Sequence, residues 1–543
     1  MKVEGTAISR IFCSAILIWM AWVTLLPAAE SLHLDPVGAT GKLVIGGGGK
    51  LPAEVRRQFL KWAGGSTAQL LIIPTASVRA DDPQASSEIL KGWQDEDIKS
   101  AAILHTRSRE TANDPEFVAA LDQATGVWFV GGIQQKIAES YVGTLFEQKL
   151  MNLLARGGVV GGSSAGAAIQ SRLMIQSGTR VANCSTGFDL LPGTVIDQHF
   201  SERNRLNRLT GVMDQFPRLV GLGIDESTAL LVDGRWMRVV GSGKVTVCWG
   251  HGTKQGLDAL QKTYQGGELL DLTSLRRIAR DRWQPVFPPR KPKAANVKHG
   301  SLMIVGGGGM SLSLVKEFVE LAGGKDASLV VLPTAMPDPI IGDRSKQMFA
   351  AVGAKNVTVL VQRKREDVES PEVLQVLKEA QGIWFGGGRQ WRFVDAYENT
   401  KAYSLLHDVL RRGGVIGGSS AGASIQGDYL ARGNPLGNLD IMAAGYERGF
   451  GFLGGVAIDQ HFAQRNRFAD MASLVKRYPQ ILGIGIDEAT ALIVKGRQGE
   501  IRGPGQVHFY DSAAPVQPNA TEYLSLSAGQ TYDLVKRQIL QKR

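Results

Sequence analysis

Apolar residues along this chain follow two patterns that alternate. Short continuous apolar runs, such as Leu43–Ile45 and Leu71–Ile73, are typical of strands buried on both faces of a sheet. Between these two runs, residues 54–62 carry apolar side chains at the three- and four-residue spacing of a helix. This alternation predicts an α/β fold with a mostly parallel sheet flanked by helices. Sheets of this kind bind ligands beyond the carboxyl ends of their strands.

The whole pattern occurs twice. Residues 43–49 return as 303–309, residues 71–76 as 330–335, and residues 127–132 as 383–388. The distance between the copies is far longer than the repeat of a solenoid, which has units of about 20–50 residues. We therefore predict two complete tandem domains, at residues 38–275 and 300–543.

A glycine-rich stretch at 157–168 organises the first half and returns at 413–424. Each copy contains Gly-x-Ser-x-Gly, after a β-branched pair and before a run of small apolar residues. This order predicts a strand, a sharp turn and a helix, with Ser164 and Ser420 exposed at the turn. The helix N-terminus would offer a backbone N–H and the positive end of its dipole to a developing oxyanion. A single copy would be equally consistent with a glycine-rich turn that contains incidental serines.

A histidine and an acidic pair follow each turn in the same order. Of the eight histidines, only His199 and His461 occupy matching positions, both within Ile-Asp-Gln-His-Phe. The sequence Gly-Ile-Asp-Glu follows each histidine. A nucleophilic serine needs a base, and the base needs an acid that orients it. Because the three features recur together in both halves, we predict a serine nucleophile in each.

Three arginines, Arg203, Arg205 and Arg208, closely follow His199. A guanidinium group binds a carboxylate through two parallel hydrogen bonds, so this cluster suggests an acidic substrate. The alternative is a solvated helix face.

Charge and composition narrow the function classes. The net charge is +10, but residues 276–299 carry eight basic residues against the single acidic Asp281, together with four prolines. We interpret 276–299 as an exposed basic linker and predict no nucleic-acid partner. The Gly46–Gly49 turn does not indicate a dinucleotide, since Ile73-Pro74-Thr75 stands where the acidic ribose ligand would be. No cofactor and no metal is expected.

The N-terminus has the order of a secretory signal peptide, which we assign to residues 1–29. Lys2 and Arg10 precede an apolar run at 11–26, which ends in Pro27-Ala28-Ala29. We expect a secreted or periplasmic protein, and the alternative is an uncleaved helix that anchors the chain in a membrane. Cys184 and Cys248 would then lie in an oxidising compartment, where they either pair or remain free.

The motifs together closely resemble the cyanophycinases, a serine peptidase family that also contains aspartyl dipeptidases. The resemblance rests on Gly-x-Ser-Ala-Gly-Ala, on Asp-Gln-His-Phe followed by x-x-Arg-x-Arg, and on Gly-Ile-Asp-Glu-x-Thr-Ala, and it covers nearly all of each half. It implies a flavodoxin-like fold related to class I glutamine amidotransferases, with a Ser-His-Glu triad. The implied substrate is cyanophycin, poly-aspartate with arginine on its β-carboxyls, and the products are β-Asp-Arg dipeptides.

The resemblance also implies roles for individual residues. It places the nucleophile at Ser164 and Ser420, the base at His199 and His461, and the acid at Glu226 and Glu488. The candidate oxyanion donors are the backbone N–H groups of Ala165, Gly132, Ala421 and Gly388. The candidate substrate-binding residues are Gln134, Asp197, Gln198, Arg203, Arg205 and Arg208 in the first half, and Gln390, Asp459, Gln460, Arg465 and Arg467 in the second.

The two halves depart from each other in two places. Asp470 stands where the first half has its third arginine, and the span from serine to histidine is shorter in the first half. We expect an acid at that place to repel an acidic substrate, and hence the first half to be more active on acidic peptides. Cyanophycinases are usually homodimers, so the tandem would form a pseudo-dimer within one chain. The alternatives are an aspartyl dipeptidase-like hydrolase that acts on other acidic peptides, or a half that only binds.

Overall fold

A computed structural model describes residues 36, 38–94, 96–252, 256–340, 344–513 and 522–540. The predicted signal peptide at 1–29 lies outside these residues. Across the described ranges, no helix combines the length and the hydropathy that crossing a membrane requires.

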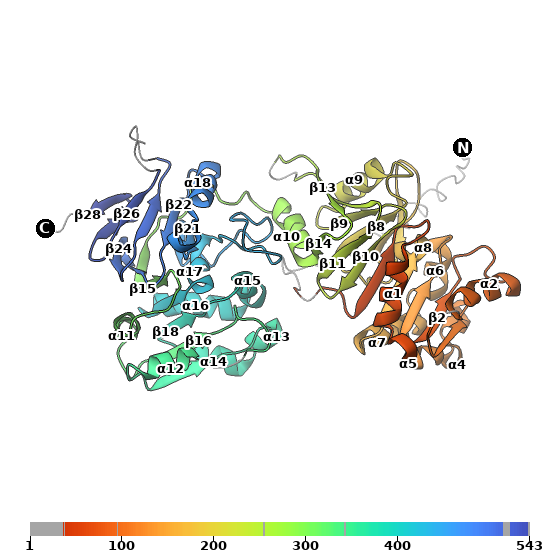
Figure 1. Ribbon diagram of the computed structural model, residues 1–543, viewed down its shortest axis with the longest axis horizontal. Helices are drawn as coiled ribbons and strands as arrows, with labels where there is room; N and C mark the ends of the chain where they lie inside the picture. The colour runs from red at the N-terminus through yellow and green to blue at the C-terminus, as the bar shows by residue number, and fades with distance from the viewer. Residues whose placement is uncertain are drawn as a thin grey trace, which may run out of the picture. The chain divides into compact units, whose positions relative to one another are not determined.

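The main sheet of the first half has a parallel core with an antiparallel extension (Figure 1). The parallel strands lie in the order β3-β2-β4-β5-β1, and β10, β11 and β14 continue the sheet beyond β1. The bounds are β1 Lys42–Gly46, β2 Gln69–Ile73, β3 Ser100–Ile103, β4 Gly126–Phe129, β5 Val159–Ser163, β10 Thr228–Asp233, β11 Trp236–Gly241 and β14 Leu269–Asp271.

A second, smaller sheet lies beside this one, and the apolar pattern did not predict it. Its order is β13-β12-β9-β8, of which only β8 and β9 are parallel. The bounds are β8 Thr194–Gln198, β9 Val220–Ile224, β12 Lys244–Trp249 and β13 Leu260–Gln265, and a separate hairpin is formed by β6 Leu173–Ser177 and β7 Asn183–Thr186. Cys248 is buried in β12 and Cys184 is exposed in β7, and both are free thiols.

Helices cover both faces of the main sheet because successive strand residues point to opposite sides. Leu43 and Ile45 of β1 face one hydrophobic core, which helix α7 completes, whereas Val44 faces a second core, which helix α1 completes. The helices are α1 Ala53–Trp62, α2 Pro83–Gln94, α3 Arg109–Ala112, α4 Pro115–Val118, α5 Ala120–Gln123, α6 Gln134–Tyr141, α7 Leu145–Ala155, α8 Ala165–Ala168, α9 Leu206–Gln215 and α10 Leu272–Trp283, with a 3₁₀ turn at Gly65–Thr67. The predicted α/β architecture is confirmed, although the sheets are mixed.

The second half repeats this arrangement. Its main sheet runs β17-β16-β18-β19-β15-β23-β24-β27-β28 and its smaller sheet β20-β21-β22-β25-β26. The strands are β15 Val297–Val305, β16 Ser328–Leu332, β17 Asn356–Val359, β18 Gly382–Phe385, β19 Val415–Ser419, β20 Gly427–Tyr429, β21 Leu453–Gln460, β22 Leu482–Ile486, β23 Ala491–Gly496, β24 Gln498–Arg502, β25 Val507–Tyr510, β26 Leu524–Leu526, β27 Thr531–Asp533 and β28 Gln538–Leu540. The helices are α11 Leu312–Leu321, α12 Arg344–Ala350, α13 Arg365–Val368, α14 Pro371–Glu379, α15 Trp391–Tyr397, α16 Lys401–Arg411, α17 Ala421–Ser424 and α18 Phe468–Arg477, with a 3₁₀ turn at Ala463–Arg465.

The register of the duplication differs by one residue at the first strand of each half. The backbone N–H of Ser164 donates to the carbonyl of Gly46, whereas that of Ser420 donates to the carbonyl of Val305. Val305 therefore takes the place of Gly46, and the match of 43–49 with 303–309 is wrong by one residue. Matching the two four-glycine runs, 46–49 and 306–309, gave this error, because the structural counterpart of Gly306 is Gly47 and not Gly46.

The segment predicted as an exposed linker is partly buried. Residues 276–283 belong to helix α10, and Arg277 and Arg280 are 2% and 6% exposed. Both donate to the carboxylate of Glu398 in the second half, at 2.6 and 2.9 Å. Two of the eight basic residues of this segment therefore form ion pairs inside the protein, whereas Arg290, Lys291, Lys293 and Lys298 are exposed. Strand β15 begins at Val297, before the predicted end of the linker.

Candidate active site

Ser164 lies at the turn between β5 and α8, as the sequence predicts. Its backbone has φ 54° and ψ −109°, a strained conformation for a residue with a side chain. The flanking glycines permit this turn, because a Cβ on Gly162 would lie 2.3 Å from the carbonyl oxygen of Gly166. The turn holds the Ser164 hydroxyl at the carboxyl edge of the parallel strands.

His199 follows β8 of the smaller sheet and reaches this hydroxyl. Its Nε2 lies 2.8 Å from Ser164 Oγ, although the two residues are 35 positions apart. The residue has φ 50°, and its N–H donates to the carbonyl of Gly47 at 2.7 Å. The imidazole is thereby fixed between the two sheets, with 8% of the residue exposed.

Glu226, and not Asp225, orients the imidazole. Its Oε1 lies 2.6 Å from His199 Nδ1. Asp225 instead accepts from the backbone N–H groups of Ser201 and Lys244, at 3.0 and 3.2 Å. The turn that carries both acids connects β9 of the smaller sheet to β10 of the main sheet, so the serine–histidine–glutamate chain lies where the two sheets meet.

The second half contains the same chain of contacts. His461 Nε2 lies 2.9 Å from Ser420 Oγ, and His461 Nδ1 lies 2.5 Å from Glu488 Oε1. Ser420 and His461 have φ 57° and 49°. The geometry of the nucleophile and of its base is therefore the same in both halves.

A glycine in each half packs directly against the imidazole. Gly48 has φ +113°, and a Cβ there would lie 2.2 Å from Cε1 of His199. Gly307 has φ +107° and the same relation to His461, also at 2.2 Å. No other residue type fits beside either ring without displacing it.

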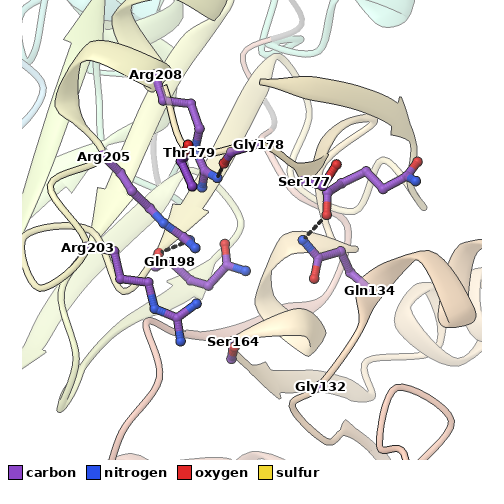
Figure 2. Close-up of a pocket in the computed structure, with 11 residues that line it drawn as sticks. Gly132, Gln134, Ser164, Ser177, Gly178, Thr179, Gln198, Arg203, Arg205 and Arg208 are labelled. Carbon is purple, nitrogen blue, oxygen red and sulfur yellow. Dashed lines mark hydrogen bonds between the residues drawn. The ribbon is translucent and has the colours of Figure 1, made fainter. Parts of the chain in front are cut away.

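A cavity of about 430 Å³ opens beside Ser164. Figure 2 shows the three predicted arginines on one side of the cavity, with Gln134 and Ser177 on the opposite side. The lining residues are Gly132, Gln134, Ser164, Gln176, Ser177, Gly178, Thr179, Gln198, Arg203, Arg205 and Arg208. The lining carries three cations, which suits an anionic ligand.

Some residues predicted to bind substrate instead contact other side chains of the protein. Asp197, predicted to bind substrate, is fully buried and instead pairs with Arg205 at 3.1 Å and with Arg208 at 3.0 Å. Asp459, its counterpart in the second half, is also fully buried and pairs with Arg467 at 2.7 Å. These buried carboxylates position arginines and do not reach a substrate.

Arg203 is the exposed arginine of the first-half cluster, and Arg465 is its exposed counterpart in the second half. Gln134 donates its amide to the carbonyls of Ile175 and Gln176, at 2.8 and 2.9 Å, and so holds the strand that forms the far wall of the cavity. Gln390 makes the same contacts in the second half, and Gln198 and Gln460 are buried at 4% and 5% exposure.

Asp470 does not confront a substrate as an unpaired charge. Its carboxylate lies 2.6 Å from Nη2 of Arg432, whose Nε lies 3.0 Å from Asp459. Arg432 is 3% exposed and comes from the loop after β20, so it replaces Arg208 from the opposite side of the cleft. The sequence analysis did not identify Arg432, because its counterpart in the first half is Gln176 and not an arginine. A comparison of the halves could have shown it, since the second half lacks an arginine at 470 and has an additional one at 432.

The predicted oxyanion donors lie beside the nucleophiles. Ala165 and Ala421 are the first residues of α8 and α17, directly after the serines. Gly131, the neighbour of Gly132, would place a Cβ 3.4 Å from that of Ser164, and Gly387, the neighbour of Gly388, one 3.5 Å from that of Ser420. Which backbone N–H groups bind an oxyanion stays a prediction.

The second half has a different cavity, of about 280 Å³, beside Ser419. Met310, Met348 and Trp384 supply apolar walls, and the chain backbone at Gly386 and Gly387 completes it. Gly386 stands where the first half has Val130, which is packed into a hydrophobic core. In the described part of the chain, no group of three or more histidine, cysteine or acidic side chains is arranged to hold a metal ion.

A family model and curated relatives that match this chain describe one kind of enzyme. Residues 43–240 and 302–502 match the sequence pattern described as peptidase family S51. The chain is 33% identical to a cyanophycinase of Geminocystis herdmanii over 221 residues, 39% of this chain and 81% of the relative. It is 33% identical to a cyanophycinase of a Nostoc species over 237 residues, 40% and 77% of the two chains. A crystal structure of a peptidase from an acI-B1 Actinobacterium is 26% identical and covers 44% of this chain and 98% of its own, with a TM-score of 0.35.

Proposed function

This chain belongs to peptidase family S51 and is a serine-type peptidase, and from that premise we propose that it hydrolyses cyanophycin to β-Asp-Arg dipeptides. The observation that carries the proposal is the pair of serine–histidine–glutamate chains, at 2.8 and 2.6 Å in the first half and 2.9 and 2.5 Å in the second. The arginine-lined cavity beside Ser164 supports an acidic substrate.

The mechanism follows from these contacts. Ser164 attacks the scissile carbonyl while His199 Nε2 takes the hydroxyl proton. Glu226, bonded to Nδ1, holds the ring in the required tautomer and stabilises the imidazolium that forms. Backbone N–H groups at Ala165 and Gly132 would bind the oxyanion, each worth about 3–4 kcal/mol in the transition state. His199 then gives the proton to the leaving amine, and water hydrolyses the acyl-enzyme.

Arg203 is the residue best placed to hold a substrate carboxylate. It is exposed and lines the cavity, whereas Arg205 and Arg208 are engaged by Asp197. The paired arginines supply a fixed positive wall, and Arg203 supplies hydrogen-bond donors to a free carboxylate of the substrate. In cyanophycin the arginine branches carry these carboxylates, because the aspartate β-carboxyls are in amide bonds. Arg465 takes this role in the second half.

The test is incubation of the protein with cyanophycin and, separately, with other aspartyl and isoaspartyl dipeptides, followed by mass spectrometry. We expect β-Asp-Arg as the product from cyanophycin. Hydrolysis of the dipeptides with cyanophycin left intact would favour the alternative, a dipeptidase-like hydrolase for other acidic peptides.

The second half is expected to stay active at lower pH than an ordinary imidazole allows. Burial lowers the pKa of His461 below its usual 6.5, and this effect outweighs the hydrogen bond to Glu488, which acts in the opposite direction. Because only the neutral ring accepts the serine proton, a lowered pKa extends activity toward acid. In Ser164→Ala protein, the acid limb of kcat/KM should therefore have its midpoint below pH 6.5. A midpoint at or above this pH would contradict the expectation.

We also propose that the protein is exported and that its two halves act as a pseudo-dimer within one chain. Lys2, Arg10 and the apolar run at 11–26 support export, which N-terminal sequencing of the secreted protein tests by finding a start near Glu30. Arg235 of the first half lies 2.5 Å from Asp395 of the second in a buried contact, which supports the pseudo-dimer. Light scattering should therefore give the mass of a single chain.

A further inference from the structure

The two clefts differ on the side of the nucleophile where the first half has its cavity. Gln134 and Gln390 mark corresponding positions in the two halves, because their side chains make the same contacts. Gln134 donates to the carbonyls of Ile175 and Gln176. Gln390 donates to the carbonyls of Ala431 and Arg432, at 2.7 and 2.8 Å. Gln176 and Arg432 each lie twelve residues after the serine. From Arg432 to His461 there are 29 residues, against 23 from Gln176 to His199, so the additional six residues all follow Arg432.

Arg432 binds the inserted residues to the floor of the cleft. Its Nη1 donates to the carbonyls of Asn438 and Leu439, at 3.1 and 2.7 Å. The same guanidinium is held by Asp459 and Asp470, at 3.0 and 2.6 Å. In the first half, the corresponding Gln176 lines the cavity beside Ser164.

Arg389, in the turn between β18 and α15, holds the same segment. It takes the place of Ile133, since the N–H of each residue donates to an equivalent carbonyl, that of Ala335 at 2.8 Å and that of Ala76 at 2.9 Å. Ile133 is 45% exposed. The guanidinium of Arg389, by contrast, donates to the carbonyls of Asn434, at 2.5 Å, and Gly437. Two guanidinium groups thus hold residues 433–440, which we term the crossing loop.

We propose that the crossing loop, held by Arg389 and Arg432, closes in the second half the side of the cleft that is open in the first. On the basis of the proposed function, the first half accepts the cyanophycin polymer. The second half accepts short acidic peptides, because a longer chain would have to pass through the crossing loop. Arg389 and Arg432 touch the loop and not the reacting atoms, so they determine specificity through its position.

The test uses two fluorophosphonates that carry the same reactive group, one with a compact ester and one with a long chain, on the full-length protein. Ser420→Ala protein reports on Ser164, and Ser164→Ala protein reports on Ser420. We expect the ratio of compact to long-chain labelling rates to be about tenfold or more higher for Ser420. Equal ratios for the two serines would overturn the inference. This comparison needs no substitution in the loop.

Arg389→Ile, which installs the first-half residue, then tests the loop in the Ser164→Ala background. The ratio should fall toward that of Ser164 while the compact reagent keeps its rate. Arg392→Ile is the matched control, because Arg392 lies on the same segment but donates to the carbonyl of Ala335, at 2.7 Å. An unchanged ratio in Arg389→Ile, or an equal change in Arg392→Ile, overturns the role of Arg389. If the compact reagent labels neither serine, the proposed function fails, and this inference fails with it.

Discussion

Replacement of both Ser164 and Ser420 by alanine should abolish hydrolysis, with a loss of about 10³-fold or more, and leave the fold intact. Each hydroxyl lies within 2.8–2.9 Å of its imidazole, and alanine removes only that oxygen from the turn. The controls are Ser163→Ala and Ser419→Ala, which alter the residue just before each nucleophile. Hydrolysis rates and circular dichroism measure the outcome; inactivation by the control changes would mean that the nucleophile is wrongly assigned.

The single variants should divide the activity unequally. Ser164→Ala should remove most of the hydrolysis of cyanophycin, because the cavity lined by Arg203 lies beside this serine. Repulsion by Asp470, the reason that the sequence suggested, does not apply, since Asp470 is paired with Arg432. A greater loss from Ser420→Ala would show that the second cleft admits the polymer.

Gly48→Ala, tested in the Ser420→Ala background, should lower kcat/KM of the first half by about 10²–10⁴-fold. This is the usual contribution of a general base to the rate. A Cβ there would lie 2.2 Å from His199 Cε1, so the ring must leave its position between Ser164 and Glu226. Gly307→Ala should act in the same way on His461 in the Ser164→Ala background.

Gly65→Ala is the control for this prediction. Gly65 also has a positive φ, +60°, but nothing lies within 4 Å of its Cβ position. The control should lower the melting temperature slightly and preserve kcat/KM. Full activity in Gly48→Ala would show that the histidine base is not held where the structure places it.

The sequence predicted those features that depend on residues close together in the chain. The turn at Ser164 needs glycine on either side, and the helix at 54–62 needs apolar residues at helical spacing, so both are visible in a single chain. The duplication showed which histidine and which acidic pair to consider, because only His199 and His461 recur in register. The choice of Glu226 over Asp225 came from the resemblance, and the contact distances support it.

The parts that the sequence did not predict depend on contacts between distant segments. Strands β12 and β13 pair in a second sheet whose edges nothing in the periodicity specifies. Arg432 reaches Asp459 across 27 positions and from a loop, so no local spacing connects them. Basic residues in α10 resembled a solvated linker because their acidic partners lie more than a hundred residues away.

The exchange of arginine between positions 208 and 432 bears on how the two copies evolve. Tandem copies within one gene are prone to gene conversion, which replaces part of one copy with the other. Conversion of α18 to the sequence of α9 would change Asp470 to arginine and crowd three guanidinium groups around Asp459. The reverse event would leave Asp197 with a single arginine. The loss of Arg208 breaks a buried ion pair, at a cost of about 3–5 kcal/mol. The loop and the helix of each copy therefore form one electrostatic unit, and recombinants that separate them should be less stable than the present chain.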